Sequence, residues 1–258
     1  MSQNIEHHIV ALEHMKKYPS TLFYEGKLAL LDRPKVSIVG TRRPSAYTRQ
    51  FTYALAKALA KRGVCVVSGA AMGVDTIAHE GAGADNTIAV VANGLDIRYP
   101  VINRILIENI EKQGLLLSQF NDGFRATGWS FVVRNELVVA LGDILIVTEA
   151  DLNSGSMRSV AFAKKMGKEI WVLPQRLGES LGTNRLLLED EAKVIQDIES
   201  FVSRFGEEAQ ETMLKDDFFY FCQKSPTFDE AVEKFGDKVY EAELEGLLTI
   251  HNGLVRLQ

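Results

Sequence analysis

The sequence predicts a doubly wound α/β fold with a mostly parallel sheet, followed by a small C-terminal unit. Short apolar runs rich in Val and Ile recur with few charges, which is typical of strands buried on both faces of a parallel sheet. Helical patterns alternate with these runs, as they do in α/β proteins. We expect strands at 36–39, 64–67, 87–91, 115–117, 144–148 and 170–173, and helices at 47–62, 73–82, 101–112, 131–141 and 155–166.

The composition is that of a globular protein with one large and one small domain. The chain has 258 residues, of which 46% are hydrophobic, and a net charge of −5. This charge argues against nucleic-acid binding over the whole surface but leaves room for a local basic groove, because affinity follows the local patch. Within the domain organisation we expect a short N-terminal extension at 1–32, a main domain at 33–205, a linker at 206–212 and a small domain at 213–258.

Several classes of protein are disfavoured by missing motifs. The two cysteines form no C-x-x-C or Cys/His cluster, so we expect no metal site and a reducing compartment. The N-terminus lacks the pattern of a secretion signal, and the most apolar region, 131–147, is interrupted by charges. No G-x-G-x-x-G follows the first strand and no P-loop is present, so we expect no cofactor. We therefore expect a cytoplasmic protein without a membrane span.

The first predicted strand leads into the most basic part of the chain. Eight Lys or Arg and no Asp or Glu lie in residues 33–74. The turn after the strand consists of Gly40, Thr41, Arg42 and Arg43. Glycine permits close backbone approach, threonine donates a hydroxyl, and arginine matches phosphate oxygens with two parallel hydrogen bonds. The pattern predicts a polyanion site, the alternative being a turn with two solvated arginines.

Small residues follow the second strand and lead into the next helix. They include Ser68, Gly69 and Gly73, which can present backbone N–H groups at a helix N-terminus to an anion. Tight strand–helix packing, with Asp75 favouring the helix dipole, explains the same pattern equally well. Asp75 and His79 lie one turn apart and could pair, but no nucleophile nearby in sequence supports a catalytic role.

Aromatic and polar residues open the helix expected at 131–141. They are Trp129, Phe131, Arg134 and Asn135. A cation and an amide beside aromatic rings suit a phosphate with a stacked base. The alternative is that both rings are core anchors. A loop at 93–100 could line the same rim, although no local feature decides this.

A third polar helix start follows the strand at 144–148. It consists of Ser154, Gly155 and Ser156, which could contact a ligand. An N-cap serine explains Ser154 equally well. For Asn184, too, contact with a ligand and a purely structural role both remain open.

The last segment, 213–258, has the pattern of a winged helix. Thr227 and Glu230 are spaced as a capping box, a further helix is expected at 238–247, and Asn252-Gly253 is a strong hairpin signal. The segment holds nine acidic and five basic residues. Acids on the expected recognition helix would oppose phosphates, so we expect contact with a protein rather than with duplex DNA.

Taken in order, six segments resemble the DprA/Smf family of DNA-processing proteins. They are IVGTRRPSAYTRQ, VVSGAAMGVDTIAHEGA, TIAVVANGLDIRYP, SFVVRNELVVALGD, VTEADLNSGSM and VLPQRLGESLGTNRLL, which lie within residues 18–198. The resemblance implies an extended Rossmann-like domain that binds single-stranded DNA. It also implies protection of incoming DNA in natural transformation, help in loading the RecA recombinase, action as a homodimer and no established catalytic activity. Binding of duplex DNA is expected to be weaker.

The family's functional positions fall on residues already singled out. Its arginine after the first strand falls on Arg42. Its other motifs fall on the glycine-rich loop around Gly69, the loop at 93–100, Phe131 with Arg134 and Asn135, the helix start at Ser154 and on Asn184. The chain departs from the family at Val132, where a proline is usual, and at Glu136, where an arginine is usual. Trp129 stands near a usually basic position and is a candidate substitute contact.

Two alternatives remain from the sequence. Related Rossmann-like folds cleave nucleoside monophosphates and carry a P-G-G-x-G-T loop, and residues 151–156 lie near the comparable place without matching it. A nucleotide-processing phosphoribohydrolase-like enzyme is therefore the runner-up. A scaffold that binds only protein would require the acid-free basic stretch to be incidental.

Overall fold

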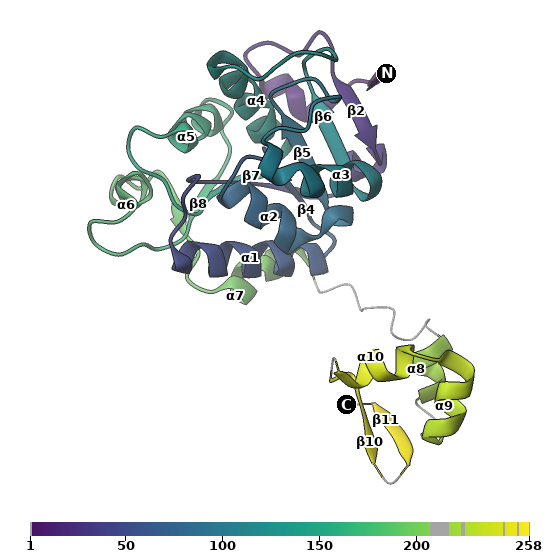
Figure 1. Ribbon diagram of the computed structural model, residues 1–258. Coiled ribbons are helices and arrows are strands. Elements are labelled where there is room, and N and C mark those ends of the chain that lie inside the picture. The colour runs from purple at the N-terminus through teal and green to yellow at the C-terminus, as the bar shows by residue number, and fades with distance from the viewer. Residues whose placement is uncertain (1, 207–216, 223–224, 245, 252, 258) are drawn as a thin grey trace. The chain divides into compact units, whose positions relative to one another are not determined.

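The computed structural model describes residues 2–206, 217–222, 225–244, 246–251 and 253–257. Two compact units are present, Met1–Glu207 and Glu208–Gln258. Each unit has its own hydrophobic core, and each is described by itself (Figure 1). The linker expected at 206–212 lies outside the described residues from 207 onward.

The first unit is built on a sheet that has nine strands in the described residues. Their order is β1-β2-β6-β5-β4-β3-β7-β8-β9. The parallel strands are β3 (Lys35–Val39), β4 (Cys65–Ser68), β5 (Thr87–Val91), β6 (Leu115–Ser118), β7 (Ile144–Val147), β8 (Ile170–Val172) and β9 (Lys193–Val194). The mostly parallel, doubly wound α/β sheet predicted from the sequence is confirmed, with all six expected strands.

Helices cover both faces of this sheet (Figure 1). One face packs against α1 (Ala46–Lys61), α2 (Val74–Ala82), α3 (Arg104–Gln113) and α7 (Ile198–Val202). The other packs against α4 (Gly128–Leu141), α5 (Gly155–Lys165) and α6 (Leu181–Leu188). Alternate strand residues enter opposite cores, as in Val66 and Val67, which is why the strands read as continuous apolar runs.

The N-terminal residues are part of the sheet rather than an appendage. β2 (Phe23–Gly26) pairs antiparallel with β6, and β1 (Gln3–Asn4) pairs with β2. The 3-10 helices η1 (Val10–His14) and η2 (Leu28–Asp32) place Leu12 and Leu30 in the core beside α4. Further 3-10 turns are η3 (Ala84–Asn86), η4 (Val101–Asn103) and η5 (Ser203–Phe205).

The strand order reverses direction between β3 and β7. From β3 the chain builds outward through β4, β5 and β6, and it then returns to add β7 on the other side of β3. Ligands of doubly wound sheets bind in the crevice outside the carboxyl ends of the strands at such a switch point. The loops after β3 and β7 are therefore the first place to look for a site.

The second unit has the winged-helix plan expected from the sequence. It contains α8 (Asp217–Cys222), α9 (Phe228–Phe235), α10 (Lys238–Leu244) and a hairpin of β10 (Leu248–His251) and β11 (Leu254–Leu257). The predicted capping box of Thr227 and Glu230 is present. The predicted turn residue Asn252 lies outside the described residues.

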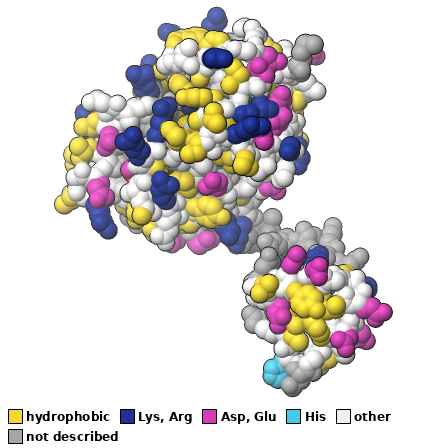
Figure 2. Space-filling view, viewed as in Figure 1, with side chains coloured by type: hydrophobic (Ala, Val, Ile, Leu, Met, Phe, Trp, Pro, Cys, Tyr) yellow, Lys and Arg dark blue, Asp and Glu magenta, His cyan; other side chains and the backbone are white. Residues whose placement is uncertain are grey.

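The surfaces of the two units differ in charge. Figure 2 shows Lys and Arg side chains over the visible face of the first unit, whereas Asp and Glu side chains surround an apolar patch on the second. Tyr240 and Leu244 of α10 are exposed apolar residues of the second unit. No helix among the described residues is long and apolar enough to cross a membrane.

Candidate nucleic-acid interface

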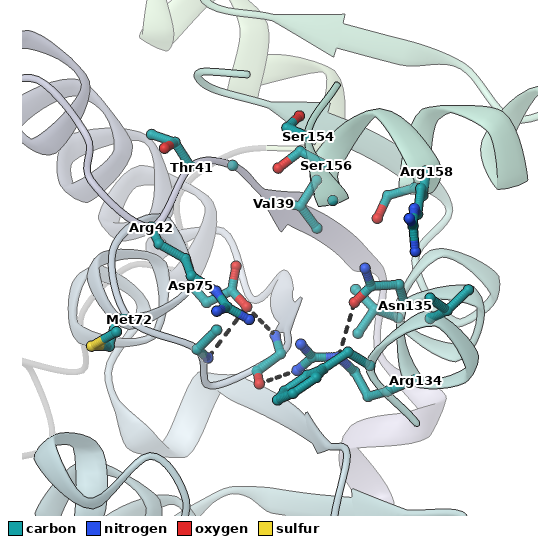
Figure 3. Close-up of a pocket in the computed structure, with 18 of the residues that line it drawn as sticks. Val39, Thr41, Arg42, Met72, Asp75, Arg134, Asn135, Ser154, Ser156 and Arg158 are labelled. Atoms are coloured by element: carbon teal, nitrogen blue, oxygen red, sulfur yellow. Dashed lines mark hydrogen bonds between the residues drawn. The ribbon is translucent and has the colours of Figure 1, made fainter. Parts of the chain in front are cut away.

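A cavity of about 550 Å³ lies at the switch point. Four segments enclose it, namely the loops after β3 and β4 and the first turns of α4 and α5. Its charged lining residues are Arg42, Asp75, Arg134 and Arg158, so three cations face one acid. Figure 3 shows these side chains around one hollow, with Ser154 and Ser156 at the start of α5.

The loop after β3 brings Gly40, Thr41 and Arg42 to the cavity. A Cβ atom on Gly40 would lie 2.5 Å from Cγ2 of Val74, so only glycine lets the loop pass this close to α2. The guanidinium of Arg42 lies over the ring of Phe131, 5.4 Å from its centroid. Arg43 is exposed and does not line the cavity.

The loop after β4 uses its N–H groups internally. Those of Gly69 and Ala71 donate to the Asp75 carboxylate at 3.2 and 3.3 Å. The Ser68 hydroxyl is buried and donates to the carbonyl of Ile38. The tight-packing interpretation therefore accounts for this loop, and Asp75 takes the place of an external anion.

Gly73 has a packing role next to this loop. A Cβ atom at Gly73 would lie 2.5 Å from the carbonyl oxygen of Thr41, and its φ of +87° is unfavourable for other residues. Gly73 does not line the cavity itself. Because Gly73 has no side chain, the loops after β3 and β4 can approach each other closely.

Arg134 forms the floor of the cavity and is only 5% exposed. Its guanidinium donates to the carbonyls of Gly69 and Val90 and, through Nε, to Asn135. Burial lowers the pKa of Arg134, and the Asp75 carboxylate opposes that change. Burial likewise raises the pKa of Asp75, with Arg134 opposing. A buried cation thus ties α4 to the loop after β4.

His79 does not pair with Asp75. The imidazole is fully buried, with Nε2 accepting from the N–H of Ala70 at 3.3 Å and Nδ1 lying 2.5 Å from the Thr87 hydroxyl. That hydroxyl donates to the carbonyl of Val66, so Nδ1 carries the proton. Burial, followed by the charge of Arg134, lowers the pKa of His79 to about 3. The histidine is a neutral support of the loop.

The aromatic residues of α4 occupy different positions. Phe131 lines the cavity and also a small second hollow beside it, which Asn93, Tyr99 and Pro100 complete. The loop at 93–100 thus reaches the same rim. Trp129 is 64% exposed, packs edge-on against Phe120 and does not line the cavity.

The first turn of α5 supplies the remaining wall. The Ser154 hydroxyl accepts a hydrogen bond from the N–H of Met157, so the N-cap interpretation holds for it. Gly155, Ser156 and Arg158 also line the cavity. Sequence reasoning missed Arg158, whose position one turn after Ser154 was the available signal.

Two further residues that the sequence singled out lie away from the cavity. Asn184 donates to the carbonyls of Arg176 and Glu179, which is a structural role. Glu136 accepts a hydrogen bond from the N–H of Lys16, so this acid holds the N-terminal segment rather than entering the cavity. Asn135, by contrast, lines it and orients Arg134.

Comparisons with known proteins agree with this fold and place the match on the first unit. The family model for DNA recombination-mediator protein A matches residues 5–206. The DNA processing protein DprA of Streptococcus pneumoniae is 32% identical over 190 residues, covering 72% of this chain and 67% of the relative. The putative DNA processing protein DprA of Mycobacterium tuberculosis is 36% identical over 177 residues, covering 66% of this chain and 46% of the relative. The chain therefore spans about half the length of that curated relative.

Two solved structures share the fold. DNA processing protein A from Helicobacter pylori, studied for its single-stranded DNA binding mode, superposes with a TM-score of 0.77 at 44% identity, covering 79% of this chain and 95% of that one. DprA from Streptococcus pneumoniae superposes with a TM-score of 0.73 at 29% identity, covering 80% and 75%.

Proposed function

The chain belongs to the DNA recombination-mediator protein A family, and from this premise we propose that it binds single-stranded DNA in the cavity at the switch point. The observation that carries the proposal is the lining of the cavity. Three arginines face a single carboxylate there, beside the ring of Phe131. Cations that meet phosphates and an aromatic face that meets a base are the two parts of a single-strand site.

Each lining residue has a separate role in this proposal. Arg42 is exposed and meets a phosphate directly, while Phe131 offers its face to a base. Arg134 is buried, so it contributes positive charge from below and holds the loop after β4 in place. The other proposed contacts are Gly40, Thr41, Gly69, Asn135, Ser154, Gly155 and Ser156, with Arg43 and Trp129 outside the cavity as outer contacts. Ser68 and Gly73 act through the loops that they support.

Single strands should bind more tightly than duplexes. A base can reach Phe131 only if it leaves its stack. In a duplex, this requires free energy for both unstacking and unpairing. Equilibrium titration of oligo-dT and of its duplex with full-length protein checks this. The proposal expects tighter binding of the single strand, and the absence of single-strand binding at low salt would overturn it.

We propose binding rather than catalysis. The one acid of the cavity lining and the histidine beside it are engaged internally, since Asp75 accepts from loop N–H groups and His79 is held neutral by burial. A phosphoribohydrolase-like enzyme would need a group free to act on its substrate. Release of free base from a panel of nucleotides would contradict our proposal.

The wider role follows from the family. We propose that the protein acts in the cytoplasm as a homodimeric recombination mediator, which protects incoming strands during natural transformation and helps to load RecA. The acidic second unit is the proposed protein contact, because its exposed acids would repel DNA. Weaker DNA binding with unchanged partner binding after deletion of that unit would contradict this assignment.

A further inference from the structure

Carboxylates of the chain itself lie beside two helix starts near the cavity. At the start of α1, Glu149 accepts hydrogen bonds from both the N–H and the hydroxyl of Ser45, at 3.0 Å each. Before α2, Asp75 accepts from the N–H groups of Gly69 and Ala71. The first N–H groups of a helix attract anions because they have no acceptor within the helix. At α1 and α2, carboxylates of the chain itself therefore already lie beside the helix start.

The start of α4 is also capped from within. Thr127 and Ser130 form a reciprocal capping box, so both hydroxyls of this turn are bonded to backbone groups. At the start of α5 the N-cap Ser154 accepts only from the N–H of Met157, and no carboxylate is hydrogen-bonded there among the described residues. The N–H groups of Gly155 and Ser156 at the cavity wall make no hydrogen bond within the described part of the chain, and a Cβ atom at Gly155 would meet open space.

Ser156 is the second, independent observation at this place. Its side chain lines the cavity, is only 7% exposed and has no hydrogen-bond partner among the described residues. In Figure 3 its hydroxyl points into the hollow between the labelled side chains. Its Oγ is open to the cavity, so a ligand in the cavity can meet this hydroxyl.

Arg158 supplies the charge for this place. It lies two residues beyond Ser156, lines the same cavity and is exposed. The structure gives it no hydrogen bond or ion pair with any described residue. An arginine fork, a free hydroxyl and two open N–H groups form a donor set that matches a phosphate.

We propose that the start of α5, formed by Gly155, Ser156 and Arg158, is a subsite for one backbone phosphodiester of the bound strand. The proposal rests on the proposed function and deepens it. It places one phosphodiester on the β7–α5 side of the cavity, across from the phosphate that Arg42 meets. The bases then turn towards Phe131.

A pair of substitutions and their combination test the subsite. Binding of 5′-hydroxyl oligo-dT is measured across a salt series for the wild type, Ser156→Ala, Arg158→Gln and the double variant. Arg176→Gln is the matched control, because Arg176 is exposed and lies outside this cavity. Thermal unfolding of each variant is measured alongside. Ser156→Ala should be as stable as the wild type, because its hydroxyl loses no partner.

The subsite predicts about tenfold weaker binding for each single variant, since each loses a hydrogen bond to a charged group. The double variant should fall well short of the product of the two losses, because both residues hold one phosphate. Arg158→Gln should lower the salt slope by about 0.7, and Arg176→Gln should not. Unchanged binding in both single variants, or additive losses in the double variant, would overturn the subsite. Failure of the wild type to bind would instead overturn the proposed function.

Discussion

At the scale of single residues, Gly69 and Arg134 depend on each other. The guanidinium of Arg134 fills the space beside Gly69 and donates to its carbonyl. The second carbonyl acceptor, that of Val90, belongs to a neighbouring strand. Any side chain at Gly69 would displace a buried cation from its acceptors and from Asp75, and an uncompensated buried charge is strongly unfavourable.

Gly69→Ala should therefore destabilise the protein by about 2–4 kcal/mol, from overpacking and from the displaced charge. Chemical denaturation with linear extrapolation measures this change. Gly128→Ala is the control, because a Cβ atom at Gly128 has no neighbour within 4 Å. If both variants unfold like the wild type, Arg134 is not held as described.

Residue roles of this kind could be predicted only in part from the sequence. The position of Gly40 to Arg42 directly after a strand was enough to predict a site there, and the structure places these residues in the lining of the cavity. The burial of Arg134 depends on acceptors in two other segments, which no local pattern reveals. Arg158 was not predicted as a site residue, because a single arginine in a predicted helix is usually a solvent-exposed side chain without a specific role.

At the scale of elements, the loop after β4 is held by His79 of α2. The buried imidazole accepts from the N–H of Ala70 and cannot take a proton without losing that bond. Its pKa of about 3 in the folded protein lies below its ordinary value of 6.5. Between these values the unfolded chain binds a proton that the folded chain excludes, so stability rises with pH in this window and is lost as the pH falls.

Unfolding free energy should thus fall by about 2 kcal/mol from this residue between pH 7 and pH 5. His79→Gln should flatten that part of the pH profile, because glutamine does not titrate there. His14→Gln is the control, since His14 is exposed. A profile for His79→Gln as steep as that of the wild type would contradict the role of His79.

Most strands of the sheet could be predicted, because parallel strands buried on both faces consist of continuous runs rich in Val and Ile. The exceptions have physical reasons. β9 has two residues, too few to show a pattern, and β2 contains Glu25 and Gly26 in place of an apolar run. Its place beside β6 is set by antiparallel pairing with a strand distant in sequence.

At the scale of the whole molecule, the chain forms two units with separate hydrophobic cores. The cavity lies wholly within residues of the first unit, and the second unit has its own core around Phe218 and Val255. The sequence predicted both units from a shift in composition and charge. It could not predict the strand order that brings the loops after β3 and β7 together.

Truncation after Gly206 should leave the first unit folded and its affinity for oligo-dT unchanged within about twofold, because all residues that line the cavity belong to the first unit, which has its own core. Size-exclusion chromatography, thermal unfolding and anisotropy titration of the truncated chain measure these properties. A large loss of oligo-dT affinity in a folded truncated chain would show that the second unit binds DNA.

The central claim is that the cavity at the switch point holds a single strand, and Arg42 tests it most directly. Fluorescence anisotropy of labelled oligo-dT across a salt series compares the wild type with Arg42→Ala and with Arg43→Ala, its exposed neighbour outside the cavity. Arg42→Ala should weaken binding about 10- to 100-fold and lower the salt slope by about 0.7, with a much smaller effect for Arg43→Ala. Equal losses in the two variants, or full affinity in Arg42→Ala, would contradict a strand bound in this cavity.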